Sequence, residues 1–266
     1  MKIEELFSVE NKIAVVTGGS RGIGEMIASA YLANGATVYI TSRKADVCDA
    51  KAIELSERYN AQCISLPSDL SSLEGIENFV KEVEALETGI DILVNNAGAA
   101  WAEPIDVFSE KGWDKVMDLN VKSVFFSTQK FLPLLKKNAS KEDPSRVINI
   151  GSIDGIGTPI FETYPYSASK ASVHHMTRVL AARLVRENIL VNAIAPGPFP
   201  SDMLGSAVAH NYEGIISRNP VHRMGRAEDV GGLALYLSSK AGSYTVGETI
   251  TCDGGTISAT GHDLSE

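Results

Sequence analysis

The sequence predicts an α/β protein in which a parallel sheet is covered by helices on both faces. Short runs rich in β-branched residues alternate with longer amphipathic stretches along nearly the whole chain, which is the order of repeated βαβ units. The short runs are almost continuously apolar, as expected of strands that are buried on both faces. A glycine-rich turn follows the first run directly, and such a turn at a helix N-terminus is typical of a phosphate-binding site.

Seven strands are expected, because each run is short, apolar and rich in Val, Ile or Thr. They cover residues 13–17, 37–41, 63–66, 92–95, 147–150, 191–195 and 248–252. The amphipathic stretches between them predict helices at residues 22–34, 45–59, 73–86, 113–137, 166–187 and 227–238. Gly35 is expected to cap the first helix. Residues 138–145, with Pro144, are expected to form a surface loop, and the proline-rich stretch 196–220 a loop with short helical pieces.

Composition restricts the possible functions. The 266 residues are 44% hydrophobic and 21% charged, as in ordinary globular proteins. A net charge of −9 argues against a nucleic-acid partner, which needs a basic face. No apolar stretch reaches the roughly 20 residues of a membrane span, and the N-terminus lacks the pattern of a signal peptide. Three cysteines without metal-ligand spacing predict a reduced, cytoplasmic protein that holds no metal. Without linker or repeat, residues 1–266 are expected to form a single domain.

The turn after the first strand reads Thr17-Gly18-Gly19-Ser20-Arg21-Gly22-Ile23-Gly24 and opens the first helix. Glycines there allow a tight turn, a close approach of backbone amides to a pyrophosphate, and close packing of the helix on the sheet. The positive end of the helix dipole would face the phosphates. No Gly-Lys-Ser/Thr follows, which disfavours a P-loop NTPase. The turn therefore predicts dinucleotide binding.

The end of the second strand indicates which dinucleotide is bound. The chain there reads Ser42-Arg43-Lys44, without a carboxylate. An acid at this point would bind a ribose 2′-hydroxyl, whereas an arginine accommodates a 2′-phosphate. Arg21 and Arg43 are expected to form that clamp through their planar guanidinium groups, the alternative being two solvated surface charges. NADP(H) is therefore preferred over NAD.

The segment Tyr166-Ser167-Ala168-Ser169-Lys170 predicts the catalytic pair. Tyr166 and Lys170, four residues apart on a helix, share one face. A tyrosine pKa of about 10 must be lowered for acid–base work near neutrality, and an adjacent ammonium group does this. Tyr164 has Ala168 four residues on, so it lacks the lysine. Ser152, just past the fifth strand, is expected to hydrogen-bond a substrate oxygen as charge builds there, unless it is an ordinary loop serine.

These segments resemble the short-chain dehydrogenase/reductase family, whose domain is a single Rossmann fold. The resemblance spans residues 17–255 and rests on the glycine turn, Asn95-Asn96-Ala97-Gly98, Tyr166-x-x-x-Lys170, Pro196-Gly197 and Cys252-Asp253-Gly254-Gly255. It implies that the catalytic residues are Asn120, Ser152, Tyr166 and Lys170. It implies that the cofactor-binding residues are Gly18, Ser20, Arg21, Gly22, Ile23, Gly24, Ser42, Arg43, Asp69, Leu70, Asn95, Ala97, Gly98, Tyr166, Lys170, Pro196, Gly197, Phe199 and Ser201.

The resemblance also implies individual roles. Asn120 would hold a helix distortion and a water that relays protons to Lys170, which would also bind the nicotinamide ribose. Asp69 would meet the adenine amino group, with a helix N-cap as its alternative role. Ser201 stands where many relatives have threonine and keeps the hydroxyl. Ser152 lies 14 residues before Tyr166, one more than is usual in the family.

Within the family, residues 112–117, 146–152 and 195–201 are most similar to 3-oxoacyl reductases of the rhamnolipid-biosynthesis branch. The implied activity is NADPH-dependent reduction of a carbonyl, in a 3-oxoacyl thioester or another ketone, with Tyr166 as proton donor. Two alternatives stay open: an NAD-linked alcohol or sugar-acid dehydrogenase, and a non-catalytic NADP-binding sensor or scaffold. The expected partners are a small-molecule substrate and a further copy of the chain, because the helices at 113–137 and 166–187 are apolar on more than one face. The resemblance implies a homotetramer, with a homodimer as the alternative. Neither a nucleic acid nor a membrane is expected as a partner.

Overall fold

A computed structural model describes residues 2–207 and 211–259. Seven strands form one parallel sheet in the order β3-β2-β1-β4-β5-β6-β7, which confirms the predicted fold class. The strands are β1 (Ile13–Thr17), β2 (Thr37–Thr41), β3 (Cys63–Ser65), β4 (Ile92–Asn95), β5 (Ser145–Ile150), β6 (Ile189–Pro196) and β7 (Thr249–Cys252). All but a few residues of β1, β2, β4, β5 and β6 are buried, which is why their sequences are nearly continuously apolar.

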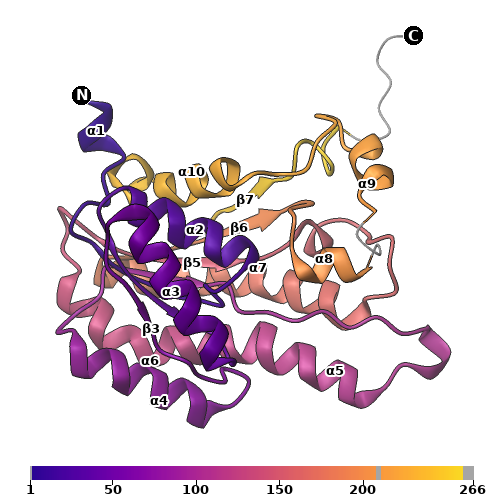
Figure 1. Cartoon of the computed structure of the whole chain (residues 1–266), viewed down its shortest axis with the longest axis horizontal. Coiled ribbons are helices and arrows are strands. Elements are labelled where there is room, and N and C mark those ends of the chain that lie inside the picture. Colours follow the sequence, from indigo (N-terminus) through magenta and orange to yellow (C-terminus); the bar gives the residue numbers. More distant parts are fainter. Residues whose placement is uncertain (1, 208–210, 260–266) are drawn as a thin grey trace.

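Helices cover both faces of this sheet (Figure 1). On one face α2 (Gly22–Ala33), α3 (Ala45–Tyr59) and α10 (Ala227–Ser238) bury an apolar cluster against the strands. On the other face α4 (Leu73–Leu86), α6 (Ser123–Asn138) and α7 (Tyr164–Leu184) form the second cluster. There the rings of Phe79 and Phe131 meet edge to face at 5.5 Å. The remaining helices are α1 (Ile3–Leu6), α5 (Glu110–Met117), α8 (Asp202–Ala207) and α9 (Glu213–Arg218).

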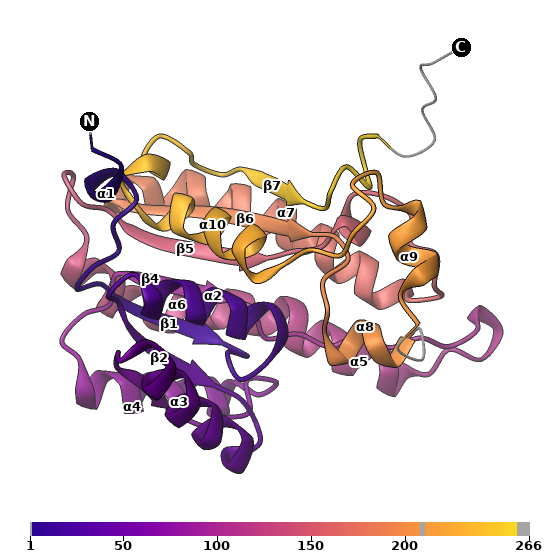
Figure 2. The same cartoon turned by 45° about the horizontal axis from the view of Figure 1, so that its top comes forward.

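The order of the strands places the functional edge. The chain moves outward from β1 to β2 and β3, then returns to β4 on the other side of β1. Ligands of doubly wound folds bind beyond the carboxyl ends of the strands at such a reversal. Figure 2 shows the strand arrowheads directed toward the end of the molecule where α8 and α9 lie.

Two predicted helices differ from the structure. The helix expected at residues 113–137 begins earlier, at Glu110, and is divided by the π-helical turn Asp118–Lys122 into α5 and α6. The helix expected at 166–187 begins at Tyr164, with Pro165 in its first turn, where a missing N–H costs nothing. It ends at Leu184, and the 3₁₀ turn Val185–Glu187 follows. The other predicted helices and strands agree to within two residues.

Candidate active site

The glycine-rich turn between β1 and α2 is shaped by positive φ angles and by close backbone approach. Gly18 and Gly22 have φ of 65° and 56°, which other residues rarely adopt. A Cβ on Gly24 would lie 2.3 Å from the Gly18 carbonyl oxygen. Asn96, directly after β4, holds the turn: its Nδ2 donates to the carbonyl oxygens of Thr17 and Gly18 at 2.9 and 3.1 Å. The sequence analysis gave Asn96 no individual role, because only the pairing of β4 with β1 brings it here.

Arg21 and Arg43 follow the ends of adjacent strands, and both are exposed. The structure does not pair them with one another. Arg21 Nη1 contacts Asp202 Oδ2 at 2.7 Å, which links the glycine turn to the start of α8. Arg43 makes no ion pair among the described residues. Exposed ion pairs contribute at most about 1 kcal/mol, so Arg21 can exchange Asp202 for a phosphate at little cost.

Three predicted cofactor residues point their side chains into the fold. The amide of Asn95 donates to Thr128 Oγ1 and Asn149 Oδ1 at 3.0 and 2.9 Å. Leu70 belongs to the core cluster beneath α4. Phe199 is buried, and a Cβ on Gly225 would lie 2.4 Å from its ring.

The other predicted cofactor residues lie along the carboxyl edge of the sheet. Asp69 accepts hydrogen bonds from Ser71, while Ser72 caps α4. Ser201 Oγ accepts from the amide of Leu204 at 3.2 Å. At the strand ends and in the loops that follow them lie Ser20, Ser42, Ala97, Gly98, Pro196 and Gly197, and Ile23 lies in the first turn of α2. A Cβ on Gly98 would lie 3.7 Å from Lys170 Nζ. Gly98, a predicted cofactor-binding residue, therefore lies next to the predicted catalytic lysine.

Tyr166 and Lys170 lie together on α7, as predicted from their spacing. Lys170 is buried, and its Nζ lies 5.5 Å from the centroid of the Tyr166 ring. The same Nζ donates to the carbonyl oxygen of Ile150 at 2.8 Å. Ile150 is the last residue of β5, and Ser152 lies two residues further along the chain. The lysine therefore fixes the end of β5 to the helix that carries the tyrosine.

Burial dominates the protonation of this pair. It raises the pKa of Tyr166 to about 12, against a hydrogen bond from Ser152 that lowers this pKa, while the charge of Asp154 raises it further. Burial also lowers the pKa of Lys170 to about 8. The lowering expected from the lysine is not seen in the protein alone, because burial is the largest influence on the Tyr166 pKa and raises it. At neutral pH Tyr166 is thus a protonated phenol that can donate its proton.

Asn120 lies at the centre of the π-helical turn and is buried. Its Oδ1 accepts from the amide of Ala99 at 2.8 Å, and its Nδ2 donates to the Ala99 carbonyl oxygen at 2.9 Å and to Ser169 Oγ at 3.0 Å. Ser169 in turn donates to the Tyr166 carbonyl oxygen at 2.6 Å. The predicted helix distortion is present, and it joins the loop after β4 to α7. The role of Ser169 was not predicted.

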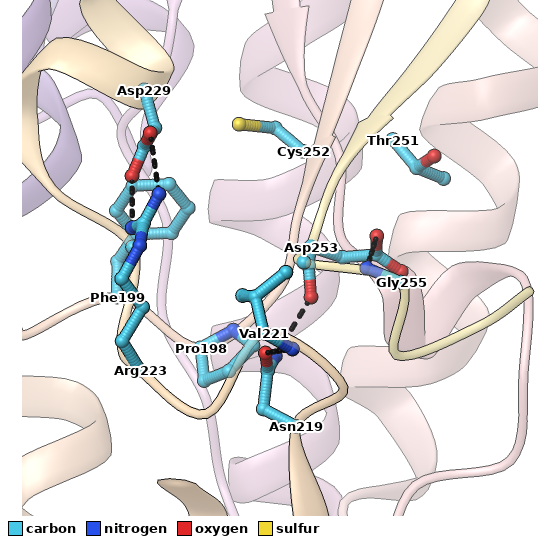
Figure 3. Close-up of a pocket in the computed structure, with 12 residues that line it drawn as sticks. Pro198, Phe199, Asn219, Val221, Arg223, Asp229, Thr251, Cys252, Asp253 and Gly255 are labelled. Atoms are coloured by element: carbon cyan, nitrogen blue, oxygen red, sulfur yellow. Dashed lines mark hydrogen bonds and ion pairs between the residues drawn. The ribbon is translucent and has the colours of Figure 1, made fainter. Parts of the chain in front are cut away.

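A cavity of about 340 Å³ lies near the ends of β6 and β7 (Figure 3). Arg223 forms two hydrogen bonds with Asp229, at 2.6 and 3.0 Å, on one side of it. On the other side Asn219 Nδ2 donates to the Asp253 carbonyl oxygen at 2.9 Å. None of the four candidate catalytic residues lines this cavity, so it is separate from the Tyr166 site.

Within residues 2–207 and 211–259, no helix has the length and apolar character needed to cross a membrane. The same part of the chain holds no group of His, Cys, Asp and Glu side chains that could bind a metal ion.

A glycine cradle at the reversal of a parallel sheet, beside a buried tyrosine–lysine pair, defines a dinucleotide-dependent oxidoreductase. A family model described as Enoyl-(Acyl carrier protein) reductase matches residues 18–256. The chain belongs to the short-chain dehydrogenase/reductase family, as the sequence motifs predicted.

Three relatives illustrate the range of the family. The chain is 45% identical over 252 residues to a rhamnolipids biosynthesis 3-oxoacyl-[acyl-carrier-protein] reductase of Pseudomonas aeruginosa, covering 94% of this chain and 97% of the relative. It is 36% identical over 255 residues to a 2-dehydro-3-deoxy-D-gluconate 5-dehydrogenase of Escherichia coli, covering 94% and 96%. The solved Pseudomonas aeruginosa RhlG/NADP active-site complex superposes with a TM-score of 0.91 at 45% identity, covering 95% and 98% of the two chains.

Proposed function

We propose that this protein reduces the carbonyl of a 3-oxoacyl thioester to a hydroxyl with NADPH. The observation that carries the proposal is the protonated Tyr166 phenol, hydrogen-bonded to Ser152 and beside buried Lys170. A protonated phenol serves reduction, because reduction needs an acid for the developing alkoxide. The substrate class is supported by the Pseudomonas relative at 45% identity, and the cofactor by the solved NADP complex and by the two exposed arginines.

The residues present fit a dinucleotide, since Gly18, Gly22 and Gly24 form a cradle that a Cβ at Gly24 would obstruct. When bound, NADPH supplies a hydride to the carbonyl carbon. Ser152 and Tyr166 hold the carbonyl oxygen between two hydroxyl donors, where negative charge develops. Tyr166 then gives its proton to that oxygen. Lys170 keeps a positive charge near the tyrosine oxygen. Asn120 lies next to this lysine: it binds Ser169, and both Asn120 and Lys170 border Gly98.

Turnover of NADPH separates this proposal from its alternatives. Purified protein is expected to oxidise NADPH in the presence of a 3-oxoacyl thioester, and to do so faster than NADH. A dehydrogenase of sugar acids such as the Escherichia coli relative would instead act on those acids. A sensor or scaffold would bind NADPH tightly and would reduce no carbonyl compound. Either outcome would refute the proposed function.

Arg43→Ala is expected to weaken NADPH binding by about 1.5–3 kcal/mol, through lost charge-assisted hydrogen bonds to the 2′-phosphate. NADH binding should hardly change, since NADH lacks that phosphate. Calorimetric titration of both cofactors measures this, with Lys44→Ala, the neighbouring exposed cation, as the matched control. Equal affinity of the wild type for NADH and NADPH would show that Arg21 and Arg43 do not bind a 2′-phosphate.

We also propose that the protein is a homotetramer, with a homodimer as its alternative. Support comes from large apolar side chains exposed on three helices of one face: Trp113 on α5, Phe125 on α6 and Val179 on α7 are 43%, 39% and 56% exposed. Helices apolar over so wide an arc usually have two partners. Light scattering is expected to give about four times the 28.4 kDa chain mass. A monomer at micromolar concentration would overturn the proposal.

We propose a cytoplasmic location and one domain over residues 1–266. Cys48, Cys63 and Cys252 are all free thiols, as is usual in reducing compartments. Burial raises the pKa of the Cys63 thiol to about 12, which keeps it unreactive.

A further inference from the structure

A buried histidine lies beneath the loop that carries Ser152. Tyr166, Lys170 and His174 follow one another at intervals of four residues on α7, so all three lie along one face of the helix. His174 is 6% exposed. Its Nε2 accepts a hydrogen bond from the amide of Ser152 at 3.4 Å. No role in the proposed reaction has so far been given to His174.

The loop is fitted to this ring by two glycines. A Cβ on Gly151 would lie 2.0 Å from His174 Nε2, and a Cβ on Gly155 would lie 2.9 Å from His174 Cε1. Neither glycine has a positive φ. Gly151 is required by its contact with His174, whereas a Cβ on Gly155 would first meet the backbone of α7, 2.6 Å from the carbonyl carbon of Lys170 and 2.7 Å from the nitrogen of Ala171. Ser152 stands between them, and its backbone rests on the ring.

The His174 ring is neutral, and its accepting nitrogen, Nε2, binds the Ser152 amide. Burial lowers the pKa of His174 to about 4, and the positive charges of Lys170 and Arg178 lower it further, while a hydrogen bond with the Gly155 backbone raises it. Because Nε2 accepts from Ser152, the single proton of the neutral ring is on Nδ1. A protonated ring would have two donors and no acceptor for the Ser152 amide. His174 therefore supports the loop and does not exchange protons with substrate.

Two successive turns of α7 hold the end of β5 and the loop that follows it. Lys170 Nζ binds the Ile150 carbonyl oxygen at 2.8 Å, and His174 binds the Ser152 amide. The Ser152 Oγ accepts from the amide of Asp154 at 3.1 Å, so its own proton can be donated to Tyr166 or, once substrate is bound, to a substrate oxygen. The direction of that hydroxyl then depends on how firmly the Ser152 backbone is held.

We propose that His174 is a positioning residue, whose neutral ring fixes the Ser152 backbone and so aims the Ser152 hydroxyl at the substrate carbonyl oxygen. The proposal rests on the proposed function, in which Ser152 donates to that oxygen. A displacement of about 1 Å in a positioned group can cost about a hundredfold in rate, so the effect of losing this support is measurable.

The test compares two amides of different reach. His174→Gln places an amide oxygen near the position of Nε2 and keeps the acceptor for Ser152. His174→Asn reaches only as far as Nδ1 and loses it. We expect His174→Asn and His174→Leu to lower kcat for carbonyl reduction by about 10- to 100-fold, and His174→Gln to stay within about threefold of wild type. Affinity for NADPH should be unchanged in all three. His175→Leu, at the exposed neighbouring histidine, should match wild type.

The same substitutions in a Ser152→Ala background separate positioning from a general structural role. If His174 acts through Ser152, His174→Asn should cost less than about twofold more in that background. An equal loss in both backgrounds, a His174→Gln variant as impaired as His174→Asn, or a His174→Asn variant with more than half of wild-type kcat would each overturn the proposal. A Ser152→Ala variant as active as wild type would instead show that the proposed function of Ser152 is wrong. Thermal unfolding of each variant shows whether it folds. If His174→Leu does not fold, the comparison of His174→Gln with His174→Asn still tests the proposal.

Discussion

Tyr166→Phe is expected to lower kcat for carbonyl reduction by about 10²–10⁴-fold while leaving NADPH affinity within about twofold of wild type. The substitution removes the proton donor and keeps the ring, which lies 5.5 Å from Lys170 Nζ. The loss should be large because burial keeps the phenol protonated, with a pKa raised to about 12, and no other acid is positioned beside Ser152 in the proposed mechanism. Steady-state kinetics with a 3-oxoacyl thioester and a separate NADPH titration measure the two quantities.

Tyr164→Phe is the matched control for this experiment. Tyr164 begins the same helix, but its side chain is 38% exposed and its hydroxyl donates to Glu162 Oε1 at 2.8 Å. Its removal should change kcat by less than about twofold, as expected of an exposed hydrogen bond. If Tyr166→Phe kept more than about a tenth of wild-type kcat, the loss of rate would be smaller than general acid catalysis contributes. The assigned proton donor would then be wrong.

Lys170→Ala is expected to lower kcat by about 10²–10³-fold, as for loss of a group that stabilises transition-state charge, and to weaken NADPH binding as well. The variant removes the ammonium beside Tyr166 and leaves the Ile150 carbonyl oxygen without its donor. Kinetics and calorimetry on the variant separate the loss of rate from the loss of binding. Near-wild-type NADPH affinity would show that Lys170 has no part in holding the cofactor.

The pH profile gives a second readout of Lys170. Burial lowers its pKa to about 8, so the side chain is charged below that pH and loses its charge as pH rises past it. The wild-type rate of reduction should therefore fall above about pH 8, and this falling limb should be absent from the residual activity of Lys170→Ala. A wild-type rate that stays level up to about pH 10 would contradict the assignment.

The sheet was predictable because its strands are buried on both faces. Strands such as β4 and β6 are entirely buried, so hydrophobicity alone marks them in the sequence. The apolar pattern at residues 113–137 continues through the π-helical turn and therefore predicted a single helix, while the distortion at Asn120 was expected only from the family resemblance. That turn is stabilised by bonds from Asn120 to Ala99 and Ser169, which are 21 and 49 residues away, and a local pattern carries no trace of them.

In the candidate site, too, residues with a local relation in the sequence were predicted, and residues brought together by tertiary packing were not. Tyr166 and Lys170 were predicted because their relation is local, four residues on one helix. The side chains of Asn95 and Phe199 are buried within the fold, and no sequence motif fixes the direction in which such a side chain points. His174 was missed because only tertiary packing places it under Ser152.

Deuterium transfer tests the central claim most directly. The protein is incubated with a 3-oxoacyl thioester and NADPH that carries deuterium on the transferred position of C4, and the product is identified by mass spectrometry. We expect a 3-hydroxyacyl thioester that keeps its oxygen and carries the deuterium on C3, formed in equal amount to the NADPH consumed. A saturated acyl product, which would come from reduction of a carbon–carbon double bond, or NADPH that binds without any transfer of deuterium, would contradict it.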